Sequence, residues 1–313
     1  MIAAQELDIE LPAVQEASLA FGRLIDSAFA INSVVILVDE YDKPILDNIS
    51  NPNIADIQKC LKGFYSVLKD RNAKERFLFV TGVSKFSHVS LFSDLNNLTD
   101  ITMDARYAEM FGYTQEELEA NFGDRITALA SNQDIESYKS EIKEWYNGYR
   151  FEENAKTVYN PVSFAKFLES GGEFNNYWFS TGTPTYLIRL LNHTQENLND
   201  LTGKYYDPSQ FIDYKADLEK PLPMIYQSGY LTIKDCDLDM GTFLLDFPNN
   251  EVKKGFVTLV ANNYLQSEKD SGSWARDIVG ALKTGDLEQV RKLFKVGTVF
   301  SSETGTINEF KVI

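Results

Sequence analysis

Cysteine, histidine and positive charge are all scarce in this chain, and each shortage argues against a class of protein. The two cysteines, Cys60 and Cys236, lie far apart in the sequence, so no disulfide framework is indicated. Two histidines argue against a histidine-based zinc site. The 30 Lys and Arg residues are outnumbered by 46 Asp and Glu residues, and the net charge of −16 argues against direct binding of duplex nucleic acid.

Long apolar runs and targeting signals are also missing. No run approaches the roughly 18 residues that can span a bilayer, and no signal-peptide pattern opens the chain. With 313 residues, of which 43% are hydrophobic and 13% aromatic, the chain is long enough for two globular domains. We therefore expect a cytoplasmic protein in a reducing setting, with no membrane segment.

The chain lacks the GxxxxGK[ST] phosphate loop of P-loop ATPases, yet one segment is typical of another part of their site. Val34–Val38 is apolar throughout, which is typical of a strand that is buried on both faces of a parallel sheet. Asp39 and Glu40 follow directly, at the end of the strand where open α/β sheets place their ligands. In P-loop ATPases this is the Walker B element, whose Asp holds Mg²⁺ and whose Glu polarises the attacking water. The alternative is a strand that ends in ordinary surface acids.

A third acid, Asp42, follows within four residues of Asp39. Three neighbouring carboxylates repel one another, and a bound cation relieves that repulsion. Asp42 is therefore a second candidate ligand for Mg²⁺, after Asp39. The alternative is that Lys43 compensates the charge without any metal.

Thr81 ends the next short apolar run, Arg76–Val80, about 40 residues after Asp39. In ASCE-type P-loop proteins, a polar residue at this place (sensor 1) contacts the γ-phosphate or the attacking water. The alternative is a threonine that simply precedes a glycine turn. Ser84, Lys85 and Arg106 lie downstream and are candidates for phosphate contacts, although a lone arginine is more often a surface charge.

Hydrophobic periodicity predicts a βαβ unit in the first third of the chain. Apolar residues recur at helical spacing up to about Ala30 and again from about Ile54 to Leu68. The two apolar runs that end at Val38 and near Gly82 are the predicted strands. Tyr41 to Pro44 is predicted as a turn.

After about Thr114 the predicted elements are mostly helices. Thr114 and Glu117 form a capping-box pattern, Asp134–Tyr146 has helical periodicity, and Pro161 and Pro184 are each predicted in the first turn of a helix. The runs 229–233 and 242–245, joined by an acidic linker at 235–239, predict a β-hairpin. Helices followed by a hairpin are typical of a winged-helix-like domain, and the last residues, 296–313, have few apolar anchors.

Several long strings in this sequence resemble the bacterial AAA-ATPase-like family. They cover about residues 15–290 in the same order as in the family. The strings are VVILVDEYDKPILDN, FLFVTGVSKFSHVSLFSDLNNLTDIT, RYAEMFGYTQEEL, WYNGYRF, VYNPVSFAKFL, YWFSTGTPTYLIRLL, QSGYLTIK and FPNNEV.

The resemblance implies an α/β fold: an incomplete P-loop NTPase (ASCE-type) parallel sheet followed by a mostly helical, winged-helix-like region. It implies that the intact family member binds ATP with Mg²⁺ and hydrolyses it. Asp39 corresponds to the Mg²⁺ ligand, Glu40 to the water-polarising base and Thr81 to sensor 1, with Ser84 as the nearby alternative. The domains expected from it are 1–112 (ATPase-like), 113–290 (helical and winged-helix-like) and a poorly anchored tail at 291–313.

The sequence departs from the family pattern at both ends. Typical members open with a phosphate loop of the form RPRRFGKS and end in a PD-(D/E)xK nuclease-like domain. This chain starts after the loop and ends near the expected start of that domain, so we expect weak or no ATPase activity. Glu309-Phe310-Lys311 matches half of the nuclease motif, either by chance or as a remnant.

Two other classes of function stay open. One is a degenerate ATPase that acts as a protein-interaction module, for which the aromatic string at 177–179 is a candidate contact, its alternative being core packing. The other is a nucleic-acid-associated protein of a mobile-element or defence system, against which the charge of −16 weighs. Without the strand before the phosphate loop, apolar strand edges are exposed, so we also expect self-association or completion by a partner.

Overall fold

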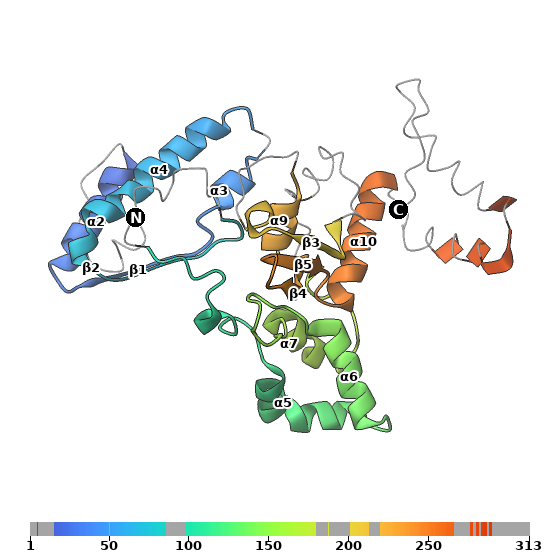
Figure 1. Ribbon diagram of the computed structural model, residues 1–313. Helices are drawn as coiled ribbons and strands as arrows, with labels where there is room; N and C mark the ends of the chain where they lie inside the picture. Colours follow the sequence, from blue (N-terminus) through green and yellow to red (C-terminus); the bar gives the residue numbers. More distant parts are fainter. Residues whose placement is uncertain are drawn as a thin grey trace, which may run out of the picture.

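The computed structural model describes residues 16–49, 51–85, 98–179, 201–212 and 220–265, together with isolated residues elsewhere. These residues form a mixed α/β structure with a small parallel sheet, a second antiparallel sheet and several helices (Figure 1). The predictions for Pro184, for the tail at 291–313 and for the Glu309-Phe310-Lys311 motif lie outside the described residues.

The N-terminal part is the βαβ unit that the periodicity predicts. Its strands are parallel, with Val35 opposite Phe77 and Val38 opposite Val80. The predicted turn contains a single helical turn with Pro44 near its start, where a missing N–H costs nothing. In chain order the elements are α2 (Ala17–Phe29), β1 (Val34–Val38), α3 (Lys43–Leu46), α4 (Ile54–Asp70) and β2 (Glu75–Val80).

The expectation that β1 is buried on both faces is wrong. Ile36 is buried, but Val35 and Leu37 on the opposite face are 54% and 70% exposed. Phe77 on β2 is 53% exposed. Figure 1 shows the reason, because α2 and α4 both lie on one side of the two strands. Within the described part of the chain, β1 and β2 pair only with each other. The sheet therefore presents an apolar face to solvent.

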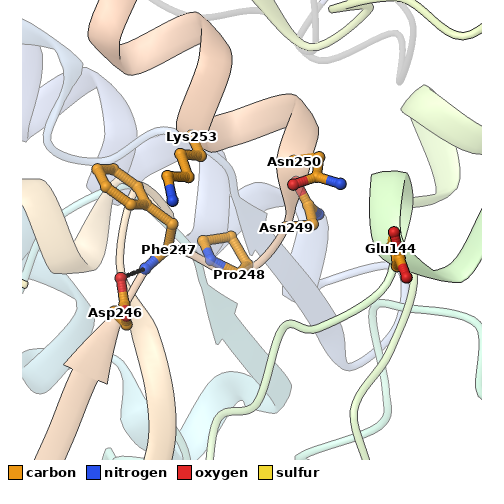
Figure 2. A pocket seen from close by; sticks show the side chains of 7 residues that line it. All are labelled: Glu144, Asp246, Phe247, Pro248, Asn249, Asn250 and Lys253. Carbon is orange, nitrogen blue, oxygen red and sulfur yellow. Dashed lines mark hydrogen bonds between the residues drawn. The ribbon is translucent and has the colours of Figure 1, made fainter. Parts of the chain in front are cut away.

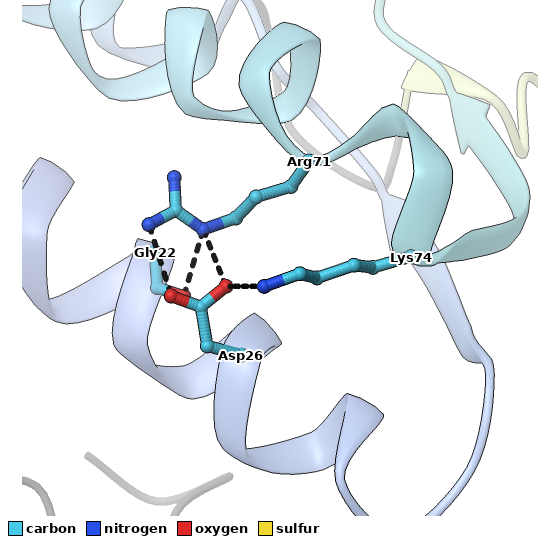
Figure 3. A network of polar contacts seen from close by, with 4 residues as sticks. All are labelled: Gly22, Asp26, Arg71 and Lys74. Carbon is cyan, nitrogen blue, oxygen red and sulfur yellow. Dashed lines mark hydrogen bonds and ion pairs between the residues drawn. The ribbon is translucent and has the colours of Figure 1, made fainter.

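A polar clamp joins α2 to the segment that follows α4 (Figure 3). The Arg71 guanidinium donates to both carboxylate oxygens of Asp26, at 2.9 and 3.1 Å, and to the carbonyl of Gly22 at 3.0 Å. Lys74 Nζ donates to Asp26 Oδ1 at 2.7 Å. The guanidinium packs directly on Gly22, where a Cβ atom would lie 2.6 Å from Arg71 Cζ and would force the Arg71 side chain to shift. The clamp fixes the packing of α2 against α4 beneath the sheet.

This clamp predicts a pH dependence of stability. Hydrogen bonds from Arg71, and then from Lys74, lower the pKa of Asp26 below its ordinary value of 3.8. The ionised Asp26 therefore stabilises the fold above pH 3.8, and this contribution is lost as the pH falls below that value. Because Asp26 is 39% exposed, we expect the loss to be under about 1 kcal/mol.

The measurement is the free energy of unfolding by urea at pH 7 and at pH 3, for the wild type and for Asp26→Asn. The variant should lose less stability between the two pH values than the wild type does. Asp124→Asn, a change at an exposed carboxylate, is the matched control. An unchanged pH dependence in Asp26→Asn would contradict the assignment.

Three of the predicted helices of the middle region are present, and each begins within about a residue of its predicted start. Thr114 and Glu117 make a reciprocal capping box, and Asp134 and Asn160 cap the next two helices through their side chains. These caps satisfy N–H groups that have no partner within the helix. The helices are α5 (Gln115–Ala130), α6 (Ile135–Tyr146) and α7 (Pro161–Glu169).

The three helices enclose a core of their own, which is rich in aromatic rings. Tyr146 lies at its centre, with ring centroids 5.3 Å from Phe167 and 6.2 Å from Phe174. Burial of each such side chain contributes about 1.5–3 kcal/mol. This core comprises residues between positions 113 and 177. It makes α5, α6 and α7 one packing unit.

The last described region contains three strands rather than the predicted two. A short strand that lacks a clear sequence signal pairs with the second strand of the predicted hairpin. Asp235 and Asp237, predicted in the linker, belong to a strand, and the turn is shorter than expected. The elements are β3 (Lys204–Tyr206), α9 (Leu222–Gln227), β4 (Thr232–Asp237), β5 (Thr242–Asp246) and α10 (Asn250–Leu265), and the sheet order is β3-β5-β4.

The largest apolar core is shared between the βαβ unit and this three-stranded region. Ile36 and Leu68 from the first belong to the same cluster as Ile225, Ile233 and Leu245 from the second. Trp178 and Phe179, considered above as partner contacts, also pack against this cluster. None of the described helices is both long and apolar enough to cross a membrane.

Candidate acidic site at the strand ends

The carboxyl ends of β1 and β2 bring Asp39 and Thr81 together. Thr81 N donates to the carbonyl of Val38 at 2.8 Å, so the ladder between the strands continues to this point. Thr81 Oγ1 then donates to Asp39 Oδ1 at 2.6 Å, and Glu40 N donates to the same oxygen at 2.9 Å. Asp39 Oδ2 accepts no hydrogen bond among the described contacts. Asp39 is exposed, so this oxygen is open to an incoming cation.

Glu40 has an unusual backbone. Its φ is +51°, in the left-handed region, which costs a residue with a Cβ roughly 1–2 kcal/mol. Its side chain is 61% exposed, and its Oε2 lies 3.8 Å from Lys43 Nζ. An exposed pair at that distance contributes little to stability, so the carboxylate is available to a ligand. Strained residues of this kind are concentrated at functional sites.

Asp42 is buried and its two oxygens are occupied by donors from the segment after β2. Oδ1 accepts from Val83 N at 3.1 Å, and Oδ2 accepts from Ser84 N at 2.6 Å and Ser84 Oγ at 2.8 Å. Asp42 is fully buried and Ser84 is 3% exposed. Both side chains are thus engaged in holding the chain that leaves Thr81.

Arg106 makes its described contacts away from the acidic group. It lies in a short 3₁₀ helix, Ala105–Tyr107, and its guanidinium donates to both oxygens of Asp104. These hydrogen bonds lower the pKa of Asp104 to about 2. None of the polar contacts found among the described residues joins Arg106 to Asp39, Glu40 or Thr81.

Tyr41 and Gln227 also belong to this region, although no sequence motif marks either residue. Tyr41 is buried, and its hydroxyl donates to the carbonyl of Ser84 at 2.7 Å. The backbone N–H of Lys85 donates to Gln227 Oε1 at 2.8 Å, across 142 positions in the sequence. A local pattern cannot predict a contact of that separation. Lys85 Nζ also pairs with Asp100 at 2.8 Å.

A shallow cavity of about 290 Å³ lies at the start of α10, facing Glu144 of α6 (Figure 2). Asp246, Phe247 and Lys253 are among the residues that line it, and Asp246 Oδ1 accepts from Phe247 N. None of the predicted site residues lines this cavity. Among the described residues, no group of three His, Cys, Asp or Glu side chains is placed so as to hold a metal ion. Protein ligands alone therefore do not complete a metal site at the strand ends.

Comparison with known proteins finds a family match over the part of the chain that contains the acidic group. Residues 9–92, which include Asp39, Glu40 and Thr81, match the model of the AAA-ATPase-like family, described as predicted AAA-ATPase. An uncharacterized protein in the vnfD 5' region of Azotobacter chroococcum mcd 1 is 36% identical over 285 residues, which are 90% of this chain and 53% of that protein. This chain thus spans about half the length of that relative. No solved structure matches the chain. Residues 9–92 are therefore similar to the predicted AAA-ATPase family, and this similarity includes the acidic site at the strand ends.

Proposed function

We propose that the acidic group at the ends of β1 and β2 is part of a site for ATP with Mg²⁺. The observation that carries the proposal is the hydrogen bond from Thr81 Oγ1 to Asp39 Oδ1 at 2.6 Å, next to the exposed carboxylate of Glu40. Ligand sites of open α/β sheets lie at such strand ends. The proposal includes a P-loop-type sheet for the βαβ unit and a winged-helix-like arrangement for the later region, with the domain limits 1–112 and 113–290.

The residues present fit a shared Mg²⁺ site. Mg²⁺ is usually bound by one or two carboxylates, several waters and the phosphates of its substrate, so such a site does not need the three-acid group that the described residues lack. Asp39 Oδ2 is the oxygen that would hold it, because Oδ1 already accepts two hydrogen bonds. Asp42 is engaged with Val83 and Ser84, which favours Asp39 as the ligand. Bound Mg²⁺ would neutralise charge on the phosphate oxygens.

The other residues have roles that follow from their positions. Thr81 fixes the orientation of the Asp39 carboxylate through its hydroxyl. Glu40 is exposed and not committed to a strong partner, so its carboxylate can orient a water for attack on the γ-phosphate. The chain contains no GxxxxGK[ST] loop, so the backbone N–H groups and the lysine that cradle phosphates in P-loop ATPases have no counterpart here. Turnover by this chain should accordingly be slow.

Calorimetric titration of the chain with Mg²⁺–ATP tests the proposal. We expect weak binding that requires Mg²⁺, with a Kd on the order of 1 mM. Asp39→Asn should weaken it at least about tenfold, because it removes the charge that holds the metal. Glu40→Gln should leave binding unchanged and abolish any hydrolysis. Asp124→Asn is the matched control, with unchanged binding expected.

Two outcomes would contradict the proposal. One is the absence of any heat of binding at millimolar Mg²⁺–ATP, and the other is binding that is equally strong in Asp39→Asn. Either result would favour the second candidate function, an interaction module. The observation behind that candidate is the exposed apolar face formed by Val35, Leu37 and Phe77.

A further inference from the structure

The segment 81–85 is held at both of its ends by contacts to distant parts of the chain. At one end, Thr81 Oγ1 donates to Asp39 in the acidic site. At the other end, Lys85 N donates to Gln227 Oε1 at 2.8 Å. Four peptide units therefore separate the acidic site from a residue of the three-stranded region.

The middle of this segment is held by hydrogen bonds to Asp42 and Tyr41. Asp42 accepts three hydrogen bonds from Val83 and Ser84, and Tyr41 OH donates to the carbonyl of Ser84. A Cβ atom at Gly82 would lie 2.5 Å from Asp42 Oδ1 and 2.6 Å from the Tyr41 ring. The segment is thus packed directly against the two residues that follow Glu40. These contacts leave the middle of the segment little free space.

Gln227 links the segment to the rest of the three-stranded region. Its Nε2 donates to the carbonyls of Phe211 and Ile212, while its Oε1 accepts from Lys85. Gln227 is the last residue of α9, in which Met224 and Ile225 are buried in the shared core. The turn after α9 is closed by Ser228 N and Tyr230 N, which donate to carbonyls of this helix. One hydrogen bond therefore links Lys85 to the end of α9.

We propose that segment 81–85 couples the acidic site to α9 and the hairpin, and that Gln227 is the positioning residue that carries this coupling. The inference rests on the proposed function only for the identity of the ligand; the coupling is a property of the contacts themselves. A cation bound at Asp39 Oδ2 lowers the negative charge on Oδ1, which accepts from Thr81 Oγ1, so it weakens the hydrogen bond that holds one end of the segment. Coupling between two sites is reciprocal, so the state of α9 also affects ligand affinity at Asp39.

The experiment measures hydrogen exchange of backbone amides in the folded chain. Asp39→Ala perturbs the site without any ligand, because alanine removes the acceptor of Thr81 Oγ1. In the wild-type background, Asp39→Ala should speed exchange at Ser84 and at Ser228 and Tyr230 by about tenfold. In a Gln227→Ala background, Asp39→Ala should still act on Ser84, whose N–H donates to Asp42, but leave Ser228 and Tyr230 unchanged. Gln227→Met, which keeps the side-chain volume without its polar atoms, should reproduce the alanine result.

Gln133→Ala, which truncates an exposed glutamine, is the matched control and should leave the coupling intact. The proposal is overturned if Asp39→Ala affects Ser228 and Tyr230 equally in both backgrounds, or affects them in neither. Addition of Mg²⁺–ATP forms a second arm. If the coupling is found but Mg²⁺–ATP does not bind, this inference stands and the proposed function is rejected. If Mg²⁺–ATP binds but slows exchange only as far as Lys85, the proposed function stands and this inference is rejected.

Discussion

Replacing Gly148 with alanine should lower the free energy of unfolding by about 3–5 kcal/mol, one of the two largest effects that we expect from single substitutions. Gly148 has a φ of +112°, and a Cβ atom there would lie 2.0 Å from the carbonyl oxygen of Pro248. That oxygen cannot move freely, because it belongs to the backbone at the start of α10 and accepts a hydrogen bond from Lys234 Nζ at 2.8 Å. Backbone strain and a steric clash therefore add.

Gly171→Ala is the control that separates the two causes. Gly171 also has a positive φ, of +82°, but a Cβ atom there meets nothing within 4 Å. It should cost only the strain, about 1–2 kcal/mol. Urea unfolding of both variants measures the difference. Equal losses in the two variants would show that the contact between Gly148 and Pro248 contributes nothing.

Asp42→Ala should cost about 3 kcal/mol or more of unfolding free energy. The change removes the acceptor for Val83 N, Ser84 N and Ser84 Oγ, and burial keeps water from replacing it. Asp42→Asn should be intermediate, because an amide keeps one acceptor oxygen for the Ser84 donors. Asp124→Ala, on the exposed surface of α5, controls for a general loss of negative charge. A loss below about 1 kcal/mol in Asp42→Ala would contradict the assigned hydrogen bonds.

Local elements could be predicted because their signals are local. The capping box at Thr114 and Glu117 is present, and the strands before Asp39 and Thr81 have the predicted bounds to within a residue or two. The meeting of Asp39 with Thr81 followed from one rule, that the carboxyl ends of parallel strands lie at the same edge of a sheet. Each of these inferences uses residues within one element or between two neighbouring ones.

Features that depend on what packs against an element could not be predicted. Val35 and Leu37 look like core residues, yet the described helices cover only the opposite face of β1. The strand Lys204–Tyr206 has three residues and no alternating pattern, so only its pairing with β5 defines it. Gln227 is part of the site's surroundings through a contact to Lys85 that no spacing rule contains.

The roles of the three carboxylates near the strand end could not be predicted fully from the sequence either. In sequence, Asp39 and Asp42 are both candidate ligands for one cation, and Glu40 is the candidate base. In the structure Asp42 turns inward to Val83 and Ser84, whereas Glu40 turns outward. The backbone is left-handed at Glu40, which no composition rule predicts for a glutamate.

The left-handed backbone at Glu40 also bears on how this position can evolve. Glycine would hold a φ of +51° without strain, and asparagine nearly so. A chain under selection for stability alone would therefore drift toward glycine at position 40. Under the proposed function, a glutamate at this position trades stability for the chemistry of its side chain. At Asp42, in contrast, the buried carboxylate itself stabilises the fold. Selection for stability alone would therefore keep Asp42 and replace Glu40.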